Sequence, residues 1–358
     1  MGPRDRASRV NPNMIILARE SRGMQQKTLA EQLKVTQGRI SKIEMGLLTI
    51  PEELLERLAA ALHYPLHFFY QEGQIMGVGV AELFHRKRKD VPQKDLSRIY
   101  ATIEIRARHI EALCKAAEVP STMQRLDVDE YDGRVEEIAM LARSTWNVPR
   151  GPIANLTQTM EDMGIIIVPC EFGTRKVDAI SRWVGSLPPM IFVNPDSPKD
   201  RYRFSLAHEL GHLIMHAVPN PEIEDQADRF AAEFLMPERE VRADLTGLSL
   251  QQLPQLKRYW RVSMASLIKK AGDIGAITES QSRYLWARMA QAGYRTREPA
   301  ELDVTGEQIT LLYELVDTHR VDLGYGEEDL QSLLALESDE LWVTYLERNA
   351  KSALRLLN

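Results

Sequence analysis

Apolar positions recur at helical spacing in the N-terminal part of the chain, where they predict a series of short helices. The first begins at Pro12, which suits an initial helical position, and stops at Gly23. Thr36 is a good N-cap for the third helix, and Gly46 suits the position just past its end. The predicted helices cover residues 12–22, 26–33, 37–44 and 51–62. This part of the chain is therefore expected to be all-α.

Beyond residue 133, helical periodicity alternates with short β-branched runs. The run at residues 165–169 is typical of a buried strand, and two further short strands are expected, split by Pro188-Pro189. The predicted strands cover residues 165–169, 179–187 and 190–193. The predicted helices cover residues 135–146, 153–163, 201–216, 224–235, 250–259, 264–272 and 279–292. The fold class that this pattern predicts is α+β and mostly helical, with the helices backed by a small sheet.

Two further segments are expected to connect or extend these regions. Residues 73–133 contain a basic run at 85–89 and predict a long helix over 96–117. The basic run is either a solvated segment or a clamp for DNA phosphates, and the long helix is either a lever between domains or a dimer seam. Residues 303–358 predict amphipathic helices that pack on the preceding domain, mediate dimers or sense a partner. The expected domains are residues 1–72, 73–133, 134–302 and 303–358.

Composition narrows the classes of protein to which the chain can belong. Its 358 residues suffice for two or three domains, and its 44% hydrophobic content is ordinary for a protein with buried cores. No apolar run approaches the ~20 residues that span a bilayer, and the charged N-terminus lacks the apolar stretch of an export signal. Two cysteines are too few for a disulfide framework, and the net charge of −6 argues against indiscriminate coating of nucleic acid. We therefore expect a cytoplasmic protein without a membrane partner.

The segment His208-Glu209-Leu210-Gly211-His212 points most directly to chemistry. On a helix, residues four apart are separated by only about 40° of rotation, so the two histidines project from one face. Two neutral imidazoles at that spacing can bind one Zn²⁺. Glu209 lies at the edge of the same face, where it could take a proton from a metal-bound water. The alternative is a solvated helix on which the histidines are incidental.

A third ligand is expected from the next helix. Pro219 and Pro221 break the chain between the two helices, so the second can fold back across the first. Glu224 would then complete a site of two histidines and one carboxylate with an open fourth position, which is typical of a catalytic zinc. Asp228, one turn later, could accept the other ring N–H of a zinc histidine and fix its tautomer. His216 is interpreted as a packing or rim residue rather than a ligand.

These motifs resemble a known family of enzymes. Residues 200–216, residue 224 and residues 230–237 look like the ImmA/IrrE family of zinc metallopeptidases, and the likeness runs from about residue 135 to residue 302. The resemblance implies a zincin-like domain in which His208, His212 and Glu224 bind Zn²⁺, with Mn²⁺ as a possible substitute, and Glu209 is the general base. Members of that family typically cleave a helix-turn-helix repressor and so release genes from repression.

The second and third predicted helices have the helix-turn-helix layout, whose second helix can enter the major groove of DNA. In that helix Ile40 and Ile43 point inward, while polar side chains that can bond base edges or phosphates point outward. Residues 26–30 and 37–46 closely resemble the XRE/Cro repressor family and depart from it at Gly38, which offers DNA no side chain. The residues expected to contact DNA are Gln26, Gln37, Arg39, Ser41 and Lys42. The alternative is a small helical bundle used for protein contacts.

Together, these observations predict a DNA-binding transcriptional regulator that carries a zinc-dependent endopeptidase. Its expected partners are double-stranded operator DNA, a repressor or other protein substrate in trans or in its own chain, and a second copy of the chain, because one such domain binds DNA weakly. Two alternatives remain open. One is a repressor whose zincin-like domain only senses a metal or ligand, and the other is an antitoxin-like protein whose C-terminal half binds a partner. The intact Glu209 favours the peptidase over the sensor, which needs no base.

Overall fold

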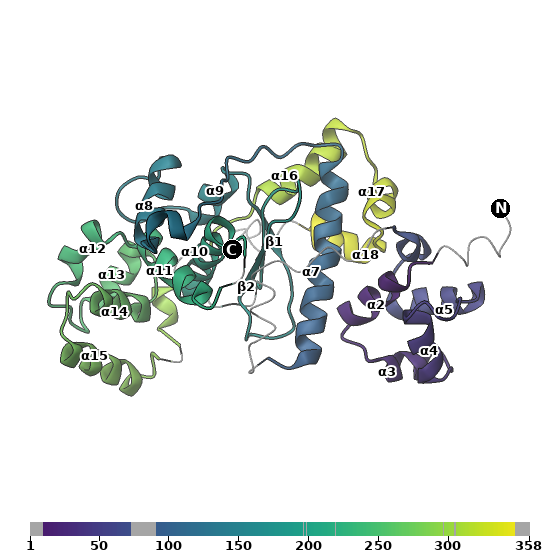
Figure 1. Cartoon of the computed structure of the whole chain (residues 1–358), viewed down its shortest axis with the longest axis horizontal. Coiled ribbons are helices and arrows are strands. Elements are labelled where there is room, and N and C mark those ends of the chain that lie inside the picture. Colours follow the sequence, from purple (N-terminus) through teal and green to yellow (C-terminus); the bar gives the residue numbers. More distant parts are fainter. Residues whose placement is uncertain are drawn as a thin grey trace, which may run out of the picture.

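The computed structural model of the chain describes residues 10–72 and 91–347, apart from residues 196, 198, 219, 296, 304 and 305. The basic run at residues 85–89 lies outside the described residues. The N-terminal helices lie at one end of the molecule, a long helix and a small sheet lie in the middle, and most helices of the second half lie at the other end (Figure 1). No helix in the described ranges is long and apolar enough to cross a membrane.

The N-terminal helices lie close to the positions that the sequence predicts. They are α2 (Pro12–Ser21), α3 (Gln26–Gln32), α4 (Gln37–Glu44) and α5 (Glu52–Leu62), followed by a 3-10 turn, η1 (Leu66–Tyr70). The hydroxyl of Thr36 accepts the backbone N–H of Arg39 and caps α4, and Gly46 has a φ of +69° just past the end of that helix. Both ends of α4 are thus set by local chemistry.

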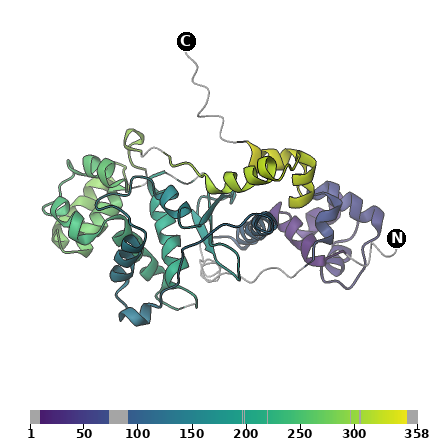
Figure 2. The same cartoon turned by 90° about the horizontal axis from the view of Figure 1, so that it is seen from above.

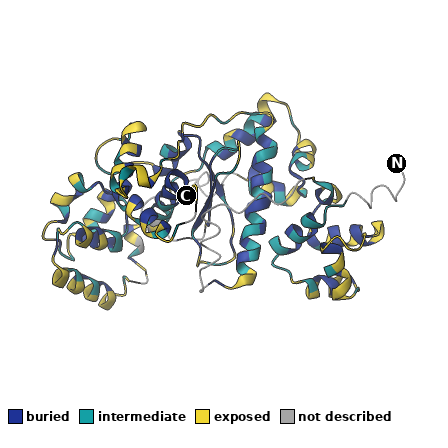
Figure 3. Ribbon diagram, in the orientation of Figure 1, coloured by how far each residue is buried: buried dark blue, intermediate teal, exposed yellow. Residues whose placement is uncertain are grey.

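The long helix α7 (Gln93–Cys114) lies between the N-terminal helices and the sheet (Figures 1 and 2). Its residues Ile99, Ile103 and Ile110 are fully buried. They belong to one apolar cluster that runs from α2 through α7 to one face of the sheet. Figure 3 shows that α7 and the sheet are mostly buried, in contrast to the helices at the far ends. The long helix therefore joins the two halves of the molecule through a shared core.

The sheet has three strands, β1 (Ile166–Pro169), β2 (Ala179–Arg182) and β3 (Met190–Val193), in the order β1-β3-β2. β1 pairs with β3 in parallel, and β2 pairs with β3 in antiparallel fashion. The prediction that β2 extends to Leu187 is wrong, because the strand ends opposite Met190, where its partner begins, and Gly185 turns the chain with a φ of +62°. β2 is consequently a short edge strand.

Residues 135–291 contain a group of helices that share one apolar cluster with the face of the sheet opposite α7. They are α8 (Val135–Thr145), α9 (Leu156–Glu161), α10 (Lys199–Met215), α11 (Ile223–Leu235), α12 (Glu238–Leu245), α13 (Leu253–Trp260), α14 (Met264–Asp273) and α15 (Glu279–Gln291). The sequence did not predict α12, in which only Val241 and Leu245 are buried, because two apolar positions give little periodicity. The predicted fold class, α+β and mostly helical, is confirmed.

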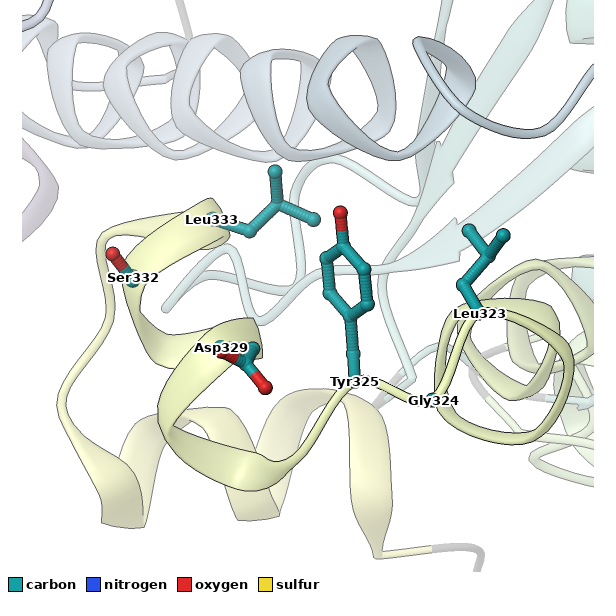
Figure 4. A pocket seen from close by; sticks show the side chains of 6 residues that line it. All are labelled: Leu323, Gly324, Tyr325, Asp329, Ser332 and Leu333. Carbon is teal, nitrogen blue, oxygen red and sulfur yellow. The ribbon is translucent and has the colours of Figure 1, made fainter.

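The C-terminal extension comprises α16 (Leu311–Asp317), η4 (Thr318–Asp322), α17 (Glu327–Leu334), α18 (Ser338–Leu341) and η5 (Trp342–Leu346). Figure 2 shows that it runs along one side of the molecule from the second half toward the N-terminal helices. A shallow depression on the extension is lined by Leu323, Gly324, Tyr325, Asp329, Ser332 and Leu333, and the ring of Tyr325 points toward the long helix (Figure 4). The extension therefore contacts both halves of the chain.

Candidate metal centre and DNA-binding surface

The candidate metal centre lies where α10 and α11 pack together. Gly211, in the middle of α10, makes this close approach possible, because a Cβ at that position would lie 3.1 Å from the ring of Phe230 in α11. Both helices contribute apolar residues to one buried cluster, which includes Leu210 and Phe234. A glycine within a helix normally costs about 1 kcal/mol relative to alanine, and here it serves the packing of the two helices.

The three expected ligands come together at this point. One potential ligand atom from each of His208, His212 and Glu224 lies within 4.8 Å of the other two. The Nε2 atoms of the two histidines are 3.0 Å apart. The carboxylate oxygens of Glu224 lie 3.8 Å from Nε2 of His208 and 3.5 Å from Nε2 of His212. Glu224 is half-exposed, so the group of three is open on the side of solvent.

The tautomer of His208 is set by Asp228 in α11. Nδ1 of His208 lies 2.9 Å from Oδ1 of Asp228, and a carboxylate can only accept, so Nδ1 carries a proton and Nε2 is the nitrogen available to a metal. Burial alone would lower the pKa of His208, but the hydrogen bond to Asp228 and the charge of Glu209 raise it above its usual value. Nζ of Lys269, in α14, approaches the other oxygen of Asp228 at 3.4 Å. The predicted Asp228 contact is therefore present.

Two ring nitrogens 3.0 Å apart require something positive between them. Because Nδ1 of His208 donates to Asp228, its Nε2 is the nitrogen that faces His212. Either a proton or a metal cation can then bridge the pair, and the carboxylate of Glu224 adds a negative charge on the same side. A set of two imidazoles and one carboxylate suits Zn²⁺, whose bonds to such ligands are about 2.0–2.2 Å long. The donor set fits the expected metal.

Glu209 lies next to His208 and His212, on the side of α10 that faces the sheet. Its side chain is buried, and its Oε2 accepts the backbone N–H of Ser181, in the edge strand β2, at 2.7 Å. The carboxylate is thus held between the candidate metal centre and the edge of the sheet. The sequence predicted Glu209 on this face but gave no indication that a strand would fix its orientation.

His216 is not among the candidate ligands. Its side chain is buried, and its Nδ1 is directed at Nδ1 of His212, at 2.9 Å, on the side of that ring remote from His208. Burial and the neighbouring His212 lower the pKa of His216 to about 3. The sequence missed Gln226, whose Oε1 lies 3.0 Å from Nε2 of His216, because a polar residue between two acidic ones has no distinctive pattern.

The predicted DNA-binding residues lie along α4 and at the start of α3. Gln37, Arg39 and Lys42 are exposed on α4, and Ser41 is half-buried on the same helix. Gln26 is the first residue of α3, and its Oε1 accepts a hydrogen bond from Nε2 of Gln37 at 2.7 Å. The two glutamines therefore hold each other in position.

A buried ion pair that the sequence did not reveal supports these glutamines. Nε of Arg19, in α2, donates to Glu44 at 2.6 Å, and both side chains are buried. The other oxygen of Glu44 accepts from Nε2 of Gln26 at 2.8 Å. A chain of hydrogen bonds thus runs from the core to the exposed side of α4 and orients Gln26 and Gln37.

Comparison with protein-family models agrees with both resemblances. Residues 15–69 match a family described as helix-turn-helix, and residues 160–271 match a family described as IrrE N-terminal-like domain. The first match indicates a DNA-binding regulator, and the second, which includes all three candidate ligands, indicates a metallopeptidase-type domain. No curated protein matches the chain.

Proposed function

We propose that this chain, in which a helix-turn-helix domain is fused to an IrrE N-terminal-like domain, is a DNA-binding regulator with metal-dependent endopeptidase activity. The observation that carries the proposal is the meeting of His208, His212 and Glu224 at one point, with the buried carboxylate of Glu209 beside them. Open coordination at a site of two histidines and one carboxylate is the arrangement of catalytic zinc.

His208, His212 and Glu224 would hold the ion, with Zn²⁺ as the expected metal and Mn²⁺ as a substitute. The bound ion would supply Lewis-acid polarisation of the scissile carbonyl and of the attacking water. Oε2 of Glu209 is engaged with the N–H of Ser181, so Oε1 would take the proton of the water and pass it to the leaving amine. Glu209 is thereby assigned the role of general base.

The edge strand β2 supports an extended peptide as the substrate. β2 pairs only with β3 in the described sheet, so its other edge faces α10 and Glu209. Because Glu209 occupies the N–H of Ser181, a peptide that adds to this edge would pair with other outward backbone groups of β2 and run past the candidate metal centre. We propose a transcriptional repressor as the substrate, either another protein or a second copy of this chain, so that cleavage ends repression.

The DNA-binding surface supplies the regulatory half of the proposal. Arg39 and Lys42 would contact base edges or phosphates from the exposed face of α4, and Gln26, Gln37 and Ser41 would add polar contacts. One such domain contacts few phosphates and binds weakly, so we propose that a homodimer binds a palindromic operator. DNA binding would bring the peptidase to its promoter or hold it there until cleavage.

A cleavage assay on the full-length chain tests this function. Wild type and Glu209→Gln are each loaded with Zn²⁺ or Mn²⁺ and incubated with candidate repressors and with tagged full-length Glu209→Gln as a substrate. We expect fragments with the wild type and at least about a hundredfold fewer with the variant, because loss of the base removes proton transfer. Equal fragment yields would rule out proteolysis that depends on Glu209, and metal binding without fragments would favour a sensor.

A further inference from the structure

Helix α10 carries a third histidine one turn beyond the two candidate ligands. Nδ1 of His216 lies 2.9 Å from Nδ1 of His212, and its Nε2 lies 3.0 Å from Oε1 of Gln226 in α11. His216 is 4% exposed and Gln226 is 8% exposed. The three side chains form a hydrogen-bonded chain that starts at a candidate ligand and ends on the neighbouring helix.

The contacts of Gln226 favour one arrangement of the protons along this chain of hydrogen bonds. Nδ2 of Asn220 also points at Oε1 of Gln226, at 3.4 Å, which agrees with that atom being the amide oxygen. An amide oxygen only accepts, so His216 donates from Nε2 and keeps a lone pair on Nδ1. That lone pair accepts the Nδ1–H of His212, which leaves Nε2 of His212 without a proton of its own. A proton carried by Nε2 of His208, or a metal cation, then bridges the two Nε2 atoms, which lie 3.0 Å apart.

The opposite arrangement of the protons would place a proton on the nitrogen of His212 that is expected to bind the metal. If the amide group of Gln226 were reversed, its nitrogen would donate to Nε2 of His216, and His216 would then donate from Nδ1 to His212. Nε2 of His212 would carry the proton and point it at the place where Nε2 of His208 lies, 3.0 Å away. The direction of one buried amide therefore decides whether His212 presents a lone pair.

We propose that His216 and Gln226 are positioning residues that set the tautomer and the ring orientation of His212 for metal binding. The inference rests on the proposed metal centre and deepens it. A partner of this kind is usual for a metal-binding histidine, and its loss typically weakens metal binding about 10–100-fold. His208 has a charged partner, Asp228, whereas the partners of His212 are neutral.

The neutral partners have a chemical consequence. Glu209, Glu224 and Asp228 already place three carboxylates in or next to the site. If a fourth carboxylate accepted the hydrogen bond of His212 in place of His216, the imidazole would donate more electron density to the metal. The metal would then be a weaker Lewis acid. The pair of His216 and Gln226 orients the ring without adding charge.

The tautomers can be read directly from the metal-free, full-length protein. Nitrogen NMR of ¹⁵N-histidine-labelled protein distinguishes protonated from unprotonated ring nitrogens, and single histidine variants assign the signals. We expect a proton on Nε2 of His216 and on Nδ1 of His212. A proton on Nδ1 of His216 would overturn the inference, whatever the protein binds or cleaves.

Metal affinity gives the second readout, from competition with a chelator. His216→Phe and Gln226→Leu should each bind Zn²⁺ about 10–100-fold more weakly than the wild type, whereas Gln226→Glu, which keeps an acceptor, should bind no more weakly. His319→Phe is the matched control, because it removes another buried histidine, whose side chain donates to or accepts from no described residue of the metal centre and lies 2.9 Å from the carbonyl oxygen of Leu315.

The outcomes distinguish a failure of the hydrogen-bonded chain of His212, His216 and Gln226, here called the relay, from a failure of the metal centre itself. Wild-type affinity in both His216→Phe and Gln226→Leu would overturn the relay and leave the peptidase proposal standing. Failure of the wild type to bind any metal would overturn the peptidase proposal, and the tautomers would still decide whether the relay exists. If His216→Phe does not fold, Gln226→Leu, which keeps all three histidines, carries the test.

Discussion

The guanidinium group of Arg22, just after α2, lies 2.6 Å from the carboxylate of Glu340 in α18, although 318 positions separate them in the chain. Arg22 also donates to the carbonyl oxygens of Leu62 and His63 and lies 4.2 Å from the centre of the Tyr64 ring. The end of the C-terminal extension is therefore bonded to the DNA-binding domain.

The start of the C-terminal extension is bonded to α9 and α10, in the part of the molecule that holds the candidate metal centre. Glu307 accepts the backbone N–H of Thr157 at 2.7 Å and pairs with the buried Arg203 of α10. Thr310 donates its hydroxyl to Glu161 in α9, also at 2.7 Å. The extension thus joins the helix that carries the candidate ligands to the helix-turn-helix domain.

The contact between Arg22 and Glu340 should measurably stabilise the packing of the C-terminal extension against the N-terminal domain. We expect a double-mutant cycle with Arg22→Ala and Glu340→Gln to give a coupling free energy of about 1–2 kcal/mol in denaturant unfolding, because the bond is charge-assisted and mostly shielded from solvent. Glu328→Gln, on an exposed position of α17, is the control and should not couple to Arg22→Ala. Purely additive effects in the first cycle would contradict the contact.

Stability should depend on pH through a histidine remote from the metal centre. His109 is buried in α7 with its Nδ1 2.8 Å from the hydroxyl of Tyr345, and burial together with the charge of Arg106 holds the pKa of His109 well below its usual value. In the unfolded chain its pKa is about 6.5, so below that pH unfolding takes up a proton and stability is lost at up to about 1.4 kcal/mol per pH unit.

The variant His109→Phe tests this dependence. Its free energy of unfolding should fall less steeply than that of the wild type between pH 7 and pH 5, so the difference between the two proteins should change with pH in that window. Guanidinium titrations at several pH values measure it. A difference that stays constant from pH 7 to pH 5 would show that His109 is not held neutral in the folded state.

DNA binding should depend on the exposed face of α4. Arg39→Ala should weaken operator binding by about 1–3 kcal/mol without changing the metal content, because it removes a donor to a base or phosphate. Arg283→Ala removes the same charge from an exposed position on α15 and should leave DNA affinity unchanged. Fluorescence anisotropy with operator DNA compares the three proteins, and unaltered affinity in Arg39→Ala would refute the assignment of α4 as the recognition helix.

Metal affinity should depend on the partner of His208. Asp228→Asn replaces a pure acceptor by an amide and should weaken Zn²⁺ binding about 10–100-fold. Asp225→Asn, on the exposed side of α11, makes the same change in charge without a contact to either histidine. Chelator competition on both variants separates the specific hydrogen bond from the general electrostatic effect, and equal losses would show that charge alone matters.

The sequence predicted the features that local geometry determines. The ends of α4 follow from a capping threonine and a following glycine, and the side-by-side placement of His208 and His212 follows from helical periodicity. Glu224 was predicted because Pro219 and Pro221 break the chain between the two helices, so that the second can fold back across the first. These relations need no knowledge of the rest of the fold.

The features that the sequence did not predict depend on tertiary docking. No local pattern indicates that Arg22 meets Glu340, or that Glu209 bonds to the backbone of Ser181 in β2. The role of Gln226 was hidden for a related reason, because only the packing of α11 against α10 turns that side chain toward His216. The buried pair of Arg19 and Glu44 would have needed the three-dimensional neighbours of α2.

The most direct test of the hydrolytic centre is a crystal structure of the zinc-loaded protein with anomalous data collected at the zinc edge. We predict one peak within about 2.0–2.2 Å of Nε2 of His208, Nε2 of His212 and a carboxylate oxygen of Glu224. We further predict that the side of the ion nearest Glu209 carries no protein ligand. A peak elsewhere, or a Glu224 side chain turned into solvent away from both rings, would contradict the account.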